Sequence, residues 1–599
     1  MANPQAMDDV RVRLSRRRFL QGAGALALVA AAPPVRGGVL LAAAGDPDAG
    51  TGFPLGIASF DPTPNRVILW TRRDGGSGDV RFRIAPAAGA GDVPPATLHP
   101  SDVILQGEAV PNGDGTYIAV PTGLEPGRRY WYQFLSGTSA SVVGRTQTAP
   151  LTTERLRLAV TSCQDLQQGW YSVWRDIARQ DLDAVLFLGD YIYEYEAYLP
   201  TERRTYPRIH VDASGAPAGE TYTLADYRQR YRQYRADPDL RAAHRMHPFI
   251  CVWDDHEVAG DRWATGAVNH GDNEDPAAIP YADREAAGVK AYFEYLPARE
   301  SRPDPRGIHR RLRYGDLADI IMLDSRSFRS EGVGGTNRNF NPTSNIDEAG
   351  ISDPDRTILG AGQKAWFKDA LRDAGPRWKL IGNQLMITPL NMAVLPDAIG
   401  AVVAEQSQRP EADPLPVTYH RDGVPVNTDQ WDGYQPERRE VLSYLRGDEG
   451  GGPVSDVVFL TGDIHTGWSS EAYVEQGDAP LGEPVAAELV CPGISSENFN
   501  ERLGMLSIGT PFPHGSTNPV GVAAIGANKH VRYVDFDSNG YVLVDVRPDR
   551  IITRQRILGL PLLNPPDYNP IEDPDATVTD APNGAFEIRR GSSRLLPVL

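Results

Sequence analysis

Three groups of acidic, histidine and tyrosine residues follow apolar runs in this chain, and their side chains are of the types that bind metal ions. They are Gly189-Asp190 with Tyr193, Asp255-His256-Glu257, and Gly462-Asp463 with His465. Each group alone is weak, because Asp and Gly commonly end strands. Gathered at one place, so many carboxylates and imidazoles would repel one another unless cations lay among them. The residue types therefore predict a metal site built from distant parts of the chain.

The apolar runs before these groups predict the strands that position them. Residues 156–161, 184–188, 249–253 and 457–460 are runs of the kind found in buried strands of layered α/β folds. In such folds, ligand sites assemble at the carboxyl ends of the strands. Residues 363–371 have apolar side chains at helical spacing and predict an amphipathic helix between two strands.

Composition shifts along the chain predict four parts. Residues 1–44 are an export signal, and short β-rich runs separated by turns predict a β-sandwich of immunoglobulin- or fibronectin-like type over residues 53–148. Residues 155–557 form the α/β domain that carries the three groups, ending in a hairpin of 541–546 with 551–555. Residues 558–599 are a Pro-rich C-terminal extension that we expect to be irregular. Surface insertions are expected at 201–222, 329–357 and 396–435.

Composition excludes several classes of protein. The 599 residues include 60 basic and 78 acidic side chains, a net charge of −18, so we expect no nucleic-acid polymer as a stable partner. The fractions of 41% hydrophobic and 23% charged residues are typical of a globular chain without a stable membrane span. Three cysteines exclude a disulfide scaffold and leave at least one thiol free or bound to a metal.

The first residues predict export. Ser15-Arg16-Arg17-Arg18-Phe19-Leu20 precedes a short Ala-rich apolar stretch and resembles a twin-arginine signal. Small residues at 30–32 and 42–44 offer two cleavage sites, which leaves the mature start open. The expected partner is the twin-arginine translocation machinery, and the expected location is periplasmic, extracellular or in the cell wall. This route carries folded proteins, which suits a chain that acquires its metals in the cytoplasm.

In combination and order, the three groups resemble the metallophosphoesterase motif set in its PhoD-type alkaline phosphatase version. The segment Thr161-Ser162-Cys163-Gln164 fits the same family, and so do residues 53–59 followed by 67–71. The resemblance covers residues 53–557. It implies an α/β fold, a four-layered αββα metallophosphoesterase sandwich preceded by the β-sandwich, and a hydrolase acting on phosphoric ester bonds.

The resemblance also implies two kinds of metal ion. The ligands implied for Fe³⁺ are Cys163, Asp190, Tyr193 and His465. Asp190 would bridge to a Ca²⁺ site completed by Asp255, Asp463 and an amide oxygen of Asn383 or Gln384, all oxygen donors as a hard cation prefers. The choice between Asp254 and Asp255 stays open, since adjacent strand-end residues point in opposite directions.

The implied reaction is attack of a metal-activated hydroxide on a phosphate mono- or diester. His256 is the expected proton donor to the leaving group, with Glu257 as its orienting partner. A phospholipase D-like lipid phosphodiesterase is the alternative within the family. A secreted binding protein with structural metals is the alternative from another class. Cys251 and Cys491 are expected in the core, and Arg326 is expected to pair with Asp324 in support of the site.

Overall fold

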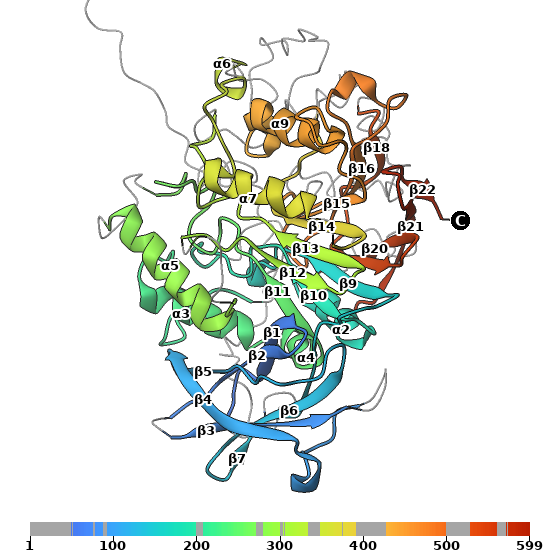
Figure 1. Ribbon diagram of the computed structural model, residues 1–599. Helices are drawn as coiled ribbons and strands as arrows, with labels where there is room; N and C mark the ends of the chain where they lie inside the picture. Colours follow the sequence, from blue (N-terminus) through green and yellow to red (C-terminus); the bar gives the residue numbers. More distant parts are fainter. Residues whose placement is uncertain are drawn as a thin grey trace, which may run out of the picture.

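The computed structural model of this chain describes residues 50–598 (Figure 1). Within this range it leaves out residues 51, 76–77, 88–92, 199–207, 271–278, 300–303, 305, 334–347, 374, 391–426, 499–527, 560–570 and 572. The predicted export signal at residues 1–44 lies outside the described residues, as does much of the insertions expected at 329–357 and 396–435.

The first sheet carries three of the four predicted strands. β9, β10, β11 and β1 run parallel at its centre, and β19 joins β9 antiparallel. The strand order is β22-β21-β20-β19-β9-β10-β11-β1-β2-β5-β4-β3-β6-β7, with β8 beside β6. The bounds are β1 (Ile57–Thr63), β2 (Arg66–Arg72), β3 (Val80–Pro86), β4 (Leu105–Gly113), β5 (Thr116–Ala119), β6 (Arg129–Ser136), β7 (Ser139–Ala140), β8 (Gly144–Gln147), β9 (Leu156–Thr161), β10 (Ala184–Phe187), β11 (Pro248–Cys251), β19 (Gly540–Val546), β20 (Arg550–Leu558), β21 (Val578–Arg589) and β22 (Leu596–Pro597).

The second sheet carries the fourth predicted strand, β15. β13, β14, β15 and β17 run parallel within the order β12-β13-β14-β15-β17-β16-β18. The bounds are β12 (Arg310–Tyr314), β13 (Ala318–Met322), β14 (Trp378–Asn383), β15 (Val457–Thr461), β16 (Gly467–Ala472), β17 (Ala486–Val490) and β18 (Val531–Asp535). The α-helices are α2 (Ser172–Arg179), α3 (Leu224–Arg235), α4 (Pro238–Met246), α5 (Tyr281–Tyr295), α6 (Glu348–Ile351), α7 (Gly360–Arg372) and α9 (Gln435–Arg446).

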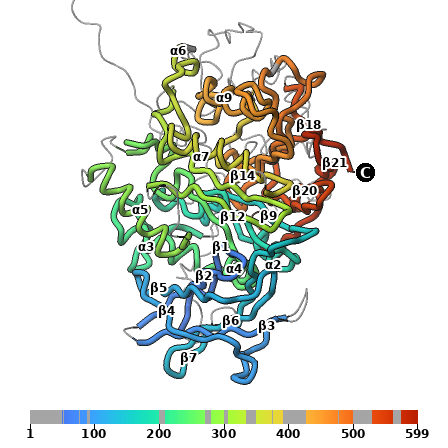
Figure 2. Tube along the Cα trace, in the orientation of Figure 1, coloured from blue at the N-terminus to red at the C-terminus, as the bar shows by residue number. Residues whose placement is uncertain are grey.

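Alternate side chains of the second sheet belong to two different cores. Leu380 of β14 packs with the apolar side chains of the first sheet, whereas Ile381 packs with α7 and α9. Because successive strand residues point to opposite faces, the second sheet lies between the first sheet and these two helices. On the first sheet, Trp174 of α2 stacks on Phe187 of β10 at a centroid distance of 5.9 Å. The layers are therefore helix, sheet, sheet and helix, and the predicted α/β layering and the helix at 363–371 are confirmed (Figures 1 and 2).

The leading β-strands are continuous with the first sheet. They enclose a separate apolar core that includes Ile57, Leu69, Phe82 and Tyr132. However, β1 also pairs with β11 in parallel, so this unit shares hydrogen bonds with the centre of the α/β part. Its assignment to the immunoglobulin or fibronectin type stays a prediction.

The C-terminal residues correct one expectation. We expected an irregular tail after residue 558, but β21 pairs with β20 and buries Phe586 and Ile588 in the main core. The predicted hairpin of β19 and β20 is confirmed. Its sheet thus continues past the hairpin to the C-terminal strands, drawn in red in Figures 1 and 2.

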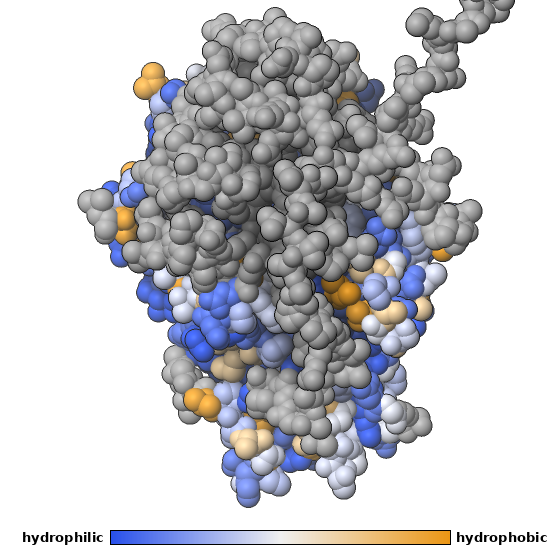
Figure 3. All heavy atoms as spheres, turned by 180° about the vertical axis from the view of Figure 1, so that it is seen from behind, coloured by the Kyte–Doolittle hydropathy of each residue, from blue (hydrophilic) through white to orange (hydrophobic). Residues whose placement is uncertain are grey.

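The surface shows little that would hold a bilayer. In the view from behind, the described residues present a mostly hydrophilic surface with apolar residues in small separate groups (Figure 3). Among the described helices, none has the length and apolarity needed to cross a membrane.

Candidate metal centre

The predicted ligands lie at the carboxyl ends of strands from both sheets. Cys163 follows β9, Asp190 follows β10 and Asp255 follows β11, while Asn383 ends β14 and Asp463 follows β15. Asn383 lies in register with Thr461, the last residue of β15. The turns approach closely: a Cβ added at Gly189, where φ is +108°, would lie 2.4 Å from the Cβ of Asp254. Glycine therefore lets the turns after β10 and β11 meet.

The first cluster contains the four residues assigned to iron. Ligand atoms of Cys163, Asp190 and His465 lie within 4.8 Å of one another. The Tyr193 hydroxyl donates to Asp190 Oδ2 over 3.0 Å and lies 3.1 Å from His465 Nε2. His465 Nδ1 is 2.9 Å from the Glu497 carbonyl, which orients the ring so that Nε2 faces the cluster. The structure thus brings thiol, carboxyl, phenol and imidazole together.

Two further clusters continue from the first. Asp190, Asp255 and His256 form one, and Asp254, Asp255 and Asp463 form the other, each with ligand atoms within 4.8 Å of one another. Asp190 belongs to two of the three clusters, as a bridging carboxylate would. Asp255 also belongs to two and Asp254 to one, so Asp255 is the better placed of the alternatives left open by the sequence.

Unpartnered buried oxygens test whether these residues fit cations. Asp190 Oδ1, Asp254 Oδ2, Asp255 Oδ1 and Asn383 Oδ1 are buried without a hydrogen-bond partner. Gln384 Oε1, by contrast, accepts from the Ser325 amide over 3.2 Å. A buried polar atom without a partner is costly, and oxygen donors are the ligands of hard cations. The donor set therefore fits a hard cation, and Asn383 is the freer of the two amide candidates.

Burial makes the protein alone a poor host for these negative charges. It raises the pKa of the Asp190 carboxyl well above its usual range. Burial, and after it the Asp190 carboxyl, likewise raise the pKa values of the Cys163 thiol and the Tyr193 phenol. Asp255 is the exception, because Arg326 and His256 outweigh burial and bring its pKa to about 2. A cation that stabilised the ionised forms would supply what this environment lacks.

The backbone of the predicted ligands is strained. Cys163, Asp190, Asp463 and His465 have φ values of +55°, +60°, +63° and +54°, which side chains other than glycine rarely adopt. The Cys163 amide donates to the Gly189 carbonyl and the Gln164 amide to the Asp190 carbonyl, each over 3.1 Å. Strained residues persist where the surrounding structure holds them, and they cluster at functional sites.

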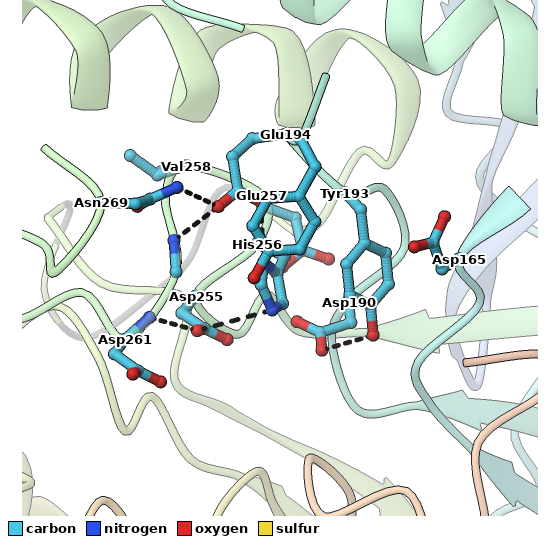
Figure 4. Close-up of polar contacts among 12 residues, drawn as sticks. Asp165, Asp190, Tyr193, Glu194, Asp255, His256, Glu257, Val258, Asp261 and Asn269 are labelled. Atoms are coloured by element: carbon cyan, nitrogen blue, oxygen red, sulfur yellow. Dashed lines mark hydrogen bonds and ion pairs between the residues drawn. The ribbon is translucent and has the colours of Figure 1, made fainter. Parts of the chain in front are cut away.

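His256 lies beside the clusters, but its partner is not the predicted one. Its Nδ1 is 2.7 Å from Glu194 Oε2, and its ring stacks on Tyr193 at a centroid distance of 4.3 Å (Figure 4). Its Nε2 lies 3.8 Å from Asp255 Oδ2. Burial lowers the pKa of His256, but Asp255 and Glu194 raise it by more, to well above its usual value.

The predicted role of Glu257 is therefore wrong. Its two carboxylate oxygens accept from the backbone amides of Tyr191 over 2.6 Å and Asp254 over 2.8 Å. Glu257 braces the turns after β10 and β11, and Glu194 orients His256 instead. Sequence analysis missed Glu194 although it directly follows Tyr193.

Arg326 also differs from expectation. Its backbone amide donates to Asp324, but its guanidinium contacts Asp254, Asp429 and Asp463. Asp429 was not predicted, because it lies outside the three motif groups and reaches the site only through the fold.

Comparisons with known proteins agree with this arrangement. The family model described as PhoD-like phosphatase matches residues 158–555, and the model of the PhoD-like phosphatase N-terminal domain matches residues 40–150. Alkaline phosphatase D of Bacillus subtilis (strain 168) is 30% identical over 482 residues, which cover 77% of this chain and 73% of that protein. A solved structure of PhoD superposes with a TM-score of 0.71 at 26% identity, covering 92% of this chain and 93% of that chain.

Proposed function

This chain belongs to the PhoD-like phosphatase family, and on that premise we propose that it is an exported, metal-dependent phosphoesterase acting on phosphate mono- or diesters. Homology to alkaline phosphatase D identifies it as a phosphoesterase hydrolase. The observation that supports metal dependence is the run of three clusters, joined through Asp190 and Asp255, whose buried oxygens include four without partners.

Two metal sets are proposed from the donor chemistry. Cys163, Asp190, Tyr193 and His465 would hold Fe³⁺, since thiolate, phenolate, carboxylate and imidazole suit a transition metal. Asp190, Asp255, Asp463 and Asn383 would hold Ca²⁺ through oxygen atoms alone. When bound, such cations would neutralise phosphoryl oxygens and lower the pKa of a water molecule towards about 7.

The chain's own residues would handle the leaving group. His256 Nε2 is on the side of Asp190 and Asp255, while Nδ1 is held by Glu194, so Nε2 is the nitrogen that would give a proton to the departing ester oxygen. Tyr193 stacks under the ring and limits its rotation.

The test combines metal analysis with turnover. We expect the purified protein to contain iron and calcium and to hydrolyse nitrophenyl phosphate and bis(nitrophenyl) phosphate, with loss of both activities on chelation and recovery on reloading. The two rates, compared side by side, decide between monoester and diester preference. Metal without turnover would favour the binding-protein alternative and contradict the proposal.

A matched pair of variants tests the iron set. Cys163→Ser is expected to lose iron and the visible charge-transfer colour of a ferric thiolate or tyrosinate. Cys251→Ser, at a buried cysteine within β11, is expected to keep both. A colourless, iron-free and active preparation of the unchanged protein would contradict the assignment of Fe³⁺.

Export by the twin-arginine route is proposed from Arg16, Arg17 and the apolar stretch that follows. Replacing both arginines by lysine is expected to hold the precursor in the cytoplasm at unchanged mass. Normal export of that variant would contradict the route.

A further inference from the structure

Arg326 is a fully buried cation beside the metal clusters. It follows β13 and has no exposed surface. Its guanidinium donates through Nε to Asp254 Oδ1, through Nη1 to Asp429 Oδ2 over 2.9 Å, and through Nη2 to Asp463 Oδ1 over 2.9 Å. Asp255 Oδ1 lies 3.5 Å from Nη2. Carboxylates from distant parts of the chain thus surround one positive group.

This arrangement has the composition of a cation site. Ligand atoms of Asp254, Asp255 and Asp463 lie within 4.8 Å of one another, close enough to share a metal ion. Asp254 Oδ2 and Asp255 Oδ1 are buried without hydrogen-bond partners. Without Arg326, these carboxylates and Asp429 would be concentrated in a buried space with less positive charge, and buried carboxylates need a counter-charge.

The surrounding contacts hold the guanidinium in place. Arg329 also binds Asp429, with its Nη1 3.3 Å from Asp429 Oδ2, so Asp429 is shared by two arginines. Gln430 Nε2 donates to Asp463 Oδ2 over 2.5 Å. The planar fork of Arg326 therefore meets carboxylates that are fixed from behind.

We propose that Arg326 is a permanent cation supplied by the chain, which fills a cation site formed by Asp254, Asp429 and Asp463 and excludes a further divalent metal ion from it. Asp255, Asn383 and Asp190, whose oxygens lack partners, remain for the exchangeable ions. The inference depends on the proposed function only for the number of ions in the unchanged protein.

The test is the number of calcium ions bound after Arg326→Met, which keeps the length and apolar stem of the side chain. Full-length protein is dialysed against Ca²⁺, and bound metal is measured by mass spectrometry and thermal unfolding is followed with and without Ca²⁺. We expect one further Ca²⁺ per chain, a lower melting temperature in chelator than that of the unchanged protein, and recovery of that loss by Ca²⁺.

Arg310→Met is the matched control. Arg310 is equally buried, but its ion pair is with a single carboxylate, Asp61, at 2.7 Å. It is expected to lower the melting temperature without binding a further ion and without rescue by Ca²⁺. Arg326→Lys keeps the positive charge and is expected to bind as many ions as the unchanged protein.

Three results would overturn the proposal. They are an unchanged calcium count in folded Arg326→Met, an additional ion in Arg326→Lys, and failure of Arg326→Met to fold at any Ca²⁺ concentration. These results are separate from the phosphoesterase activity. Unchanged protein that hydrolyses phosphate esters while Arg326→Met gains no ion retains the proposed function and loses this inference. A gained ion in a protein without turnover does the reverse.

Discussion

The hydrogen bond from His256 to Glu194 leads to a sharp kinetic prediction for Glu194→Gln. Glu194 is fully buried and accepts from His256 Nδ1 over 2.7 Å, the Gly260 amide over 2.8 Å and Asn269 Nδ2 over 2.5 Å. A glutamine has one acceptor oxygen, so its NH₂ group must face either the imidazole N–H or the other two donors. The variant loses the negative charge that orients and stabilises the protonated imidazole.

The expected loss follows from the strength of that bond. A hydrogen bond to a charged group contributes about 1.5–3 kcal/mol, and about 1.4 kcal/mol corresponds to a factor of ten in rate. Glu194→Gln should therefore lower kcat by about ten- to hundredfold. His256→Ala should lower it by about a hundredfold or more, because it removes the proton donor itself, and should leave iron bound.

The assay compares two leaving groups on metal-loaded enzyme. An alkyl phosphate needs a proton on its departing oxygen, whereas a nitrophenolate leaves readily without one. Glu194→Gln should slow the alkyl ester by more than the nitrophenyl ester. In the His256→Ala background, the same change should add no more than about a twofold effect, because Glu194 would act only through His256.

Glu437→Gln is the control for converting a buried glutamate to an amide. Glu437 lies on α9 and accepts from Thr357 and the Ile358 amide, away from the candidate centre. It is expected to leave the ratio of the two rates unchanged. Equal losses on both esters for Glu194→Gln, or an undiminished loss in the His256→Ala background, would refute the reasoning. Full activity of His256→Ala would remove His256 from the mechanism.

Three other predictions concern stability. Asp61→Asn removes the only carboxylate in the buried pair with Arg310 and should cost about 3–5 kcal/mol in urea unfolding, and a loss below about 1 kcal/mol would contradict this. Deleting residues 577–599 removes β21 and the buried Phe586, so the melting temperature should fall, and an unchanged value would show that β21 adds nothing. Burial lowers the pKa of His247 to about 3 and of His530 to about 4 from 6.5, so unfolding takes up protons between those values. Stability should therefore fall as pH drops from 6.5 towards 4, and a smaller slope is expected for His247→Gln, whereas an unchanged slope would contradict the prediction.

Some elements were predictable because one local rule decides them. β9, β10, β11 and β15 are buried strands, so continuous apolar runs revealed them. β21 was missed because its pairing with β20 shifts register between Arg554 and Arg556, and Asn583 within it has a φ of +60°. Such a bulge interrupts the alternation by which a strand is recognised.

The same contrast holds in the candidate centre. Cys163, Asp190, Asp255 and His465 were predicted because they follow strands, and parallel strands bring their carboxyl ends to one edge. Glu257 was assigned to His256 from adjacency in sequence, whereas the true partner, Glu194, is 62 residues away.

The sequence by itself determined which chemical groups stand at the strand ends, because burial and strand geometry act over a few neighbouring residues. Only the tertiary structure decided that His256 binds Glu194, that Arg326 lies among Asp254, Asp429 and Asp463, and that Asn383 keeps a free oxygen while Gln384 does not. These pairings depend on distances between segments far apart in the chain. In a buried site each polar group must find its partner within about 3 Å, and that requirement is met only when the whole fold is assembled.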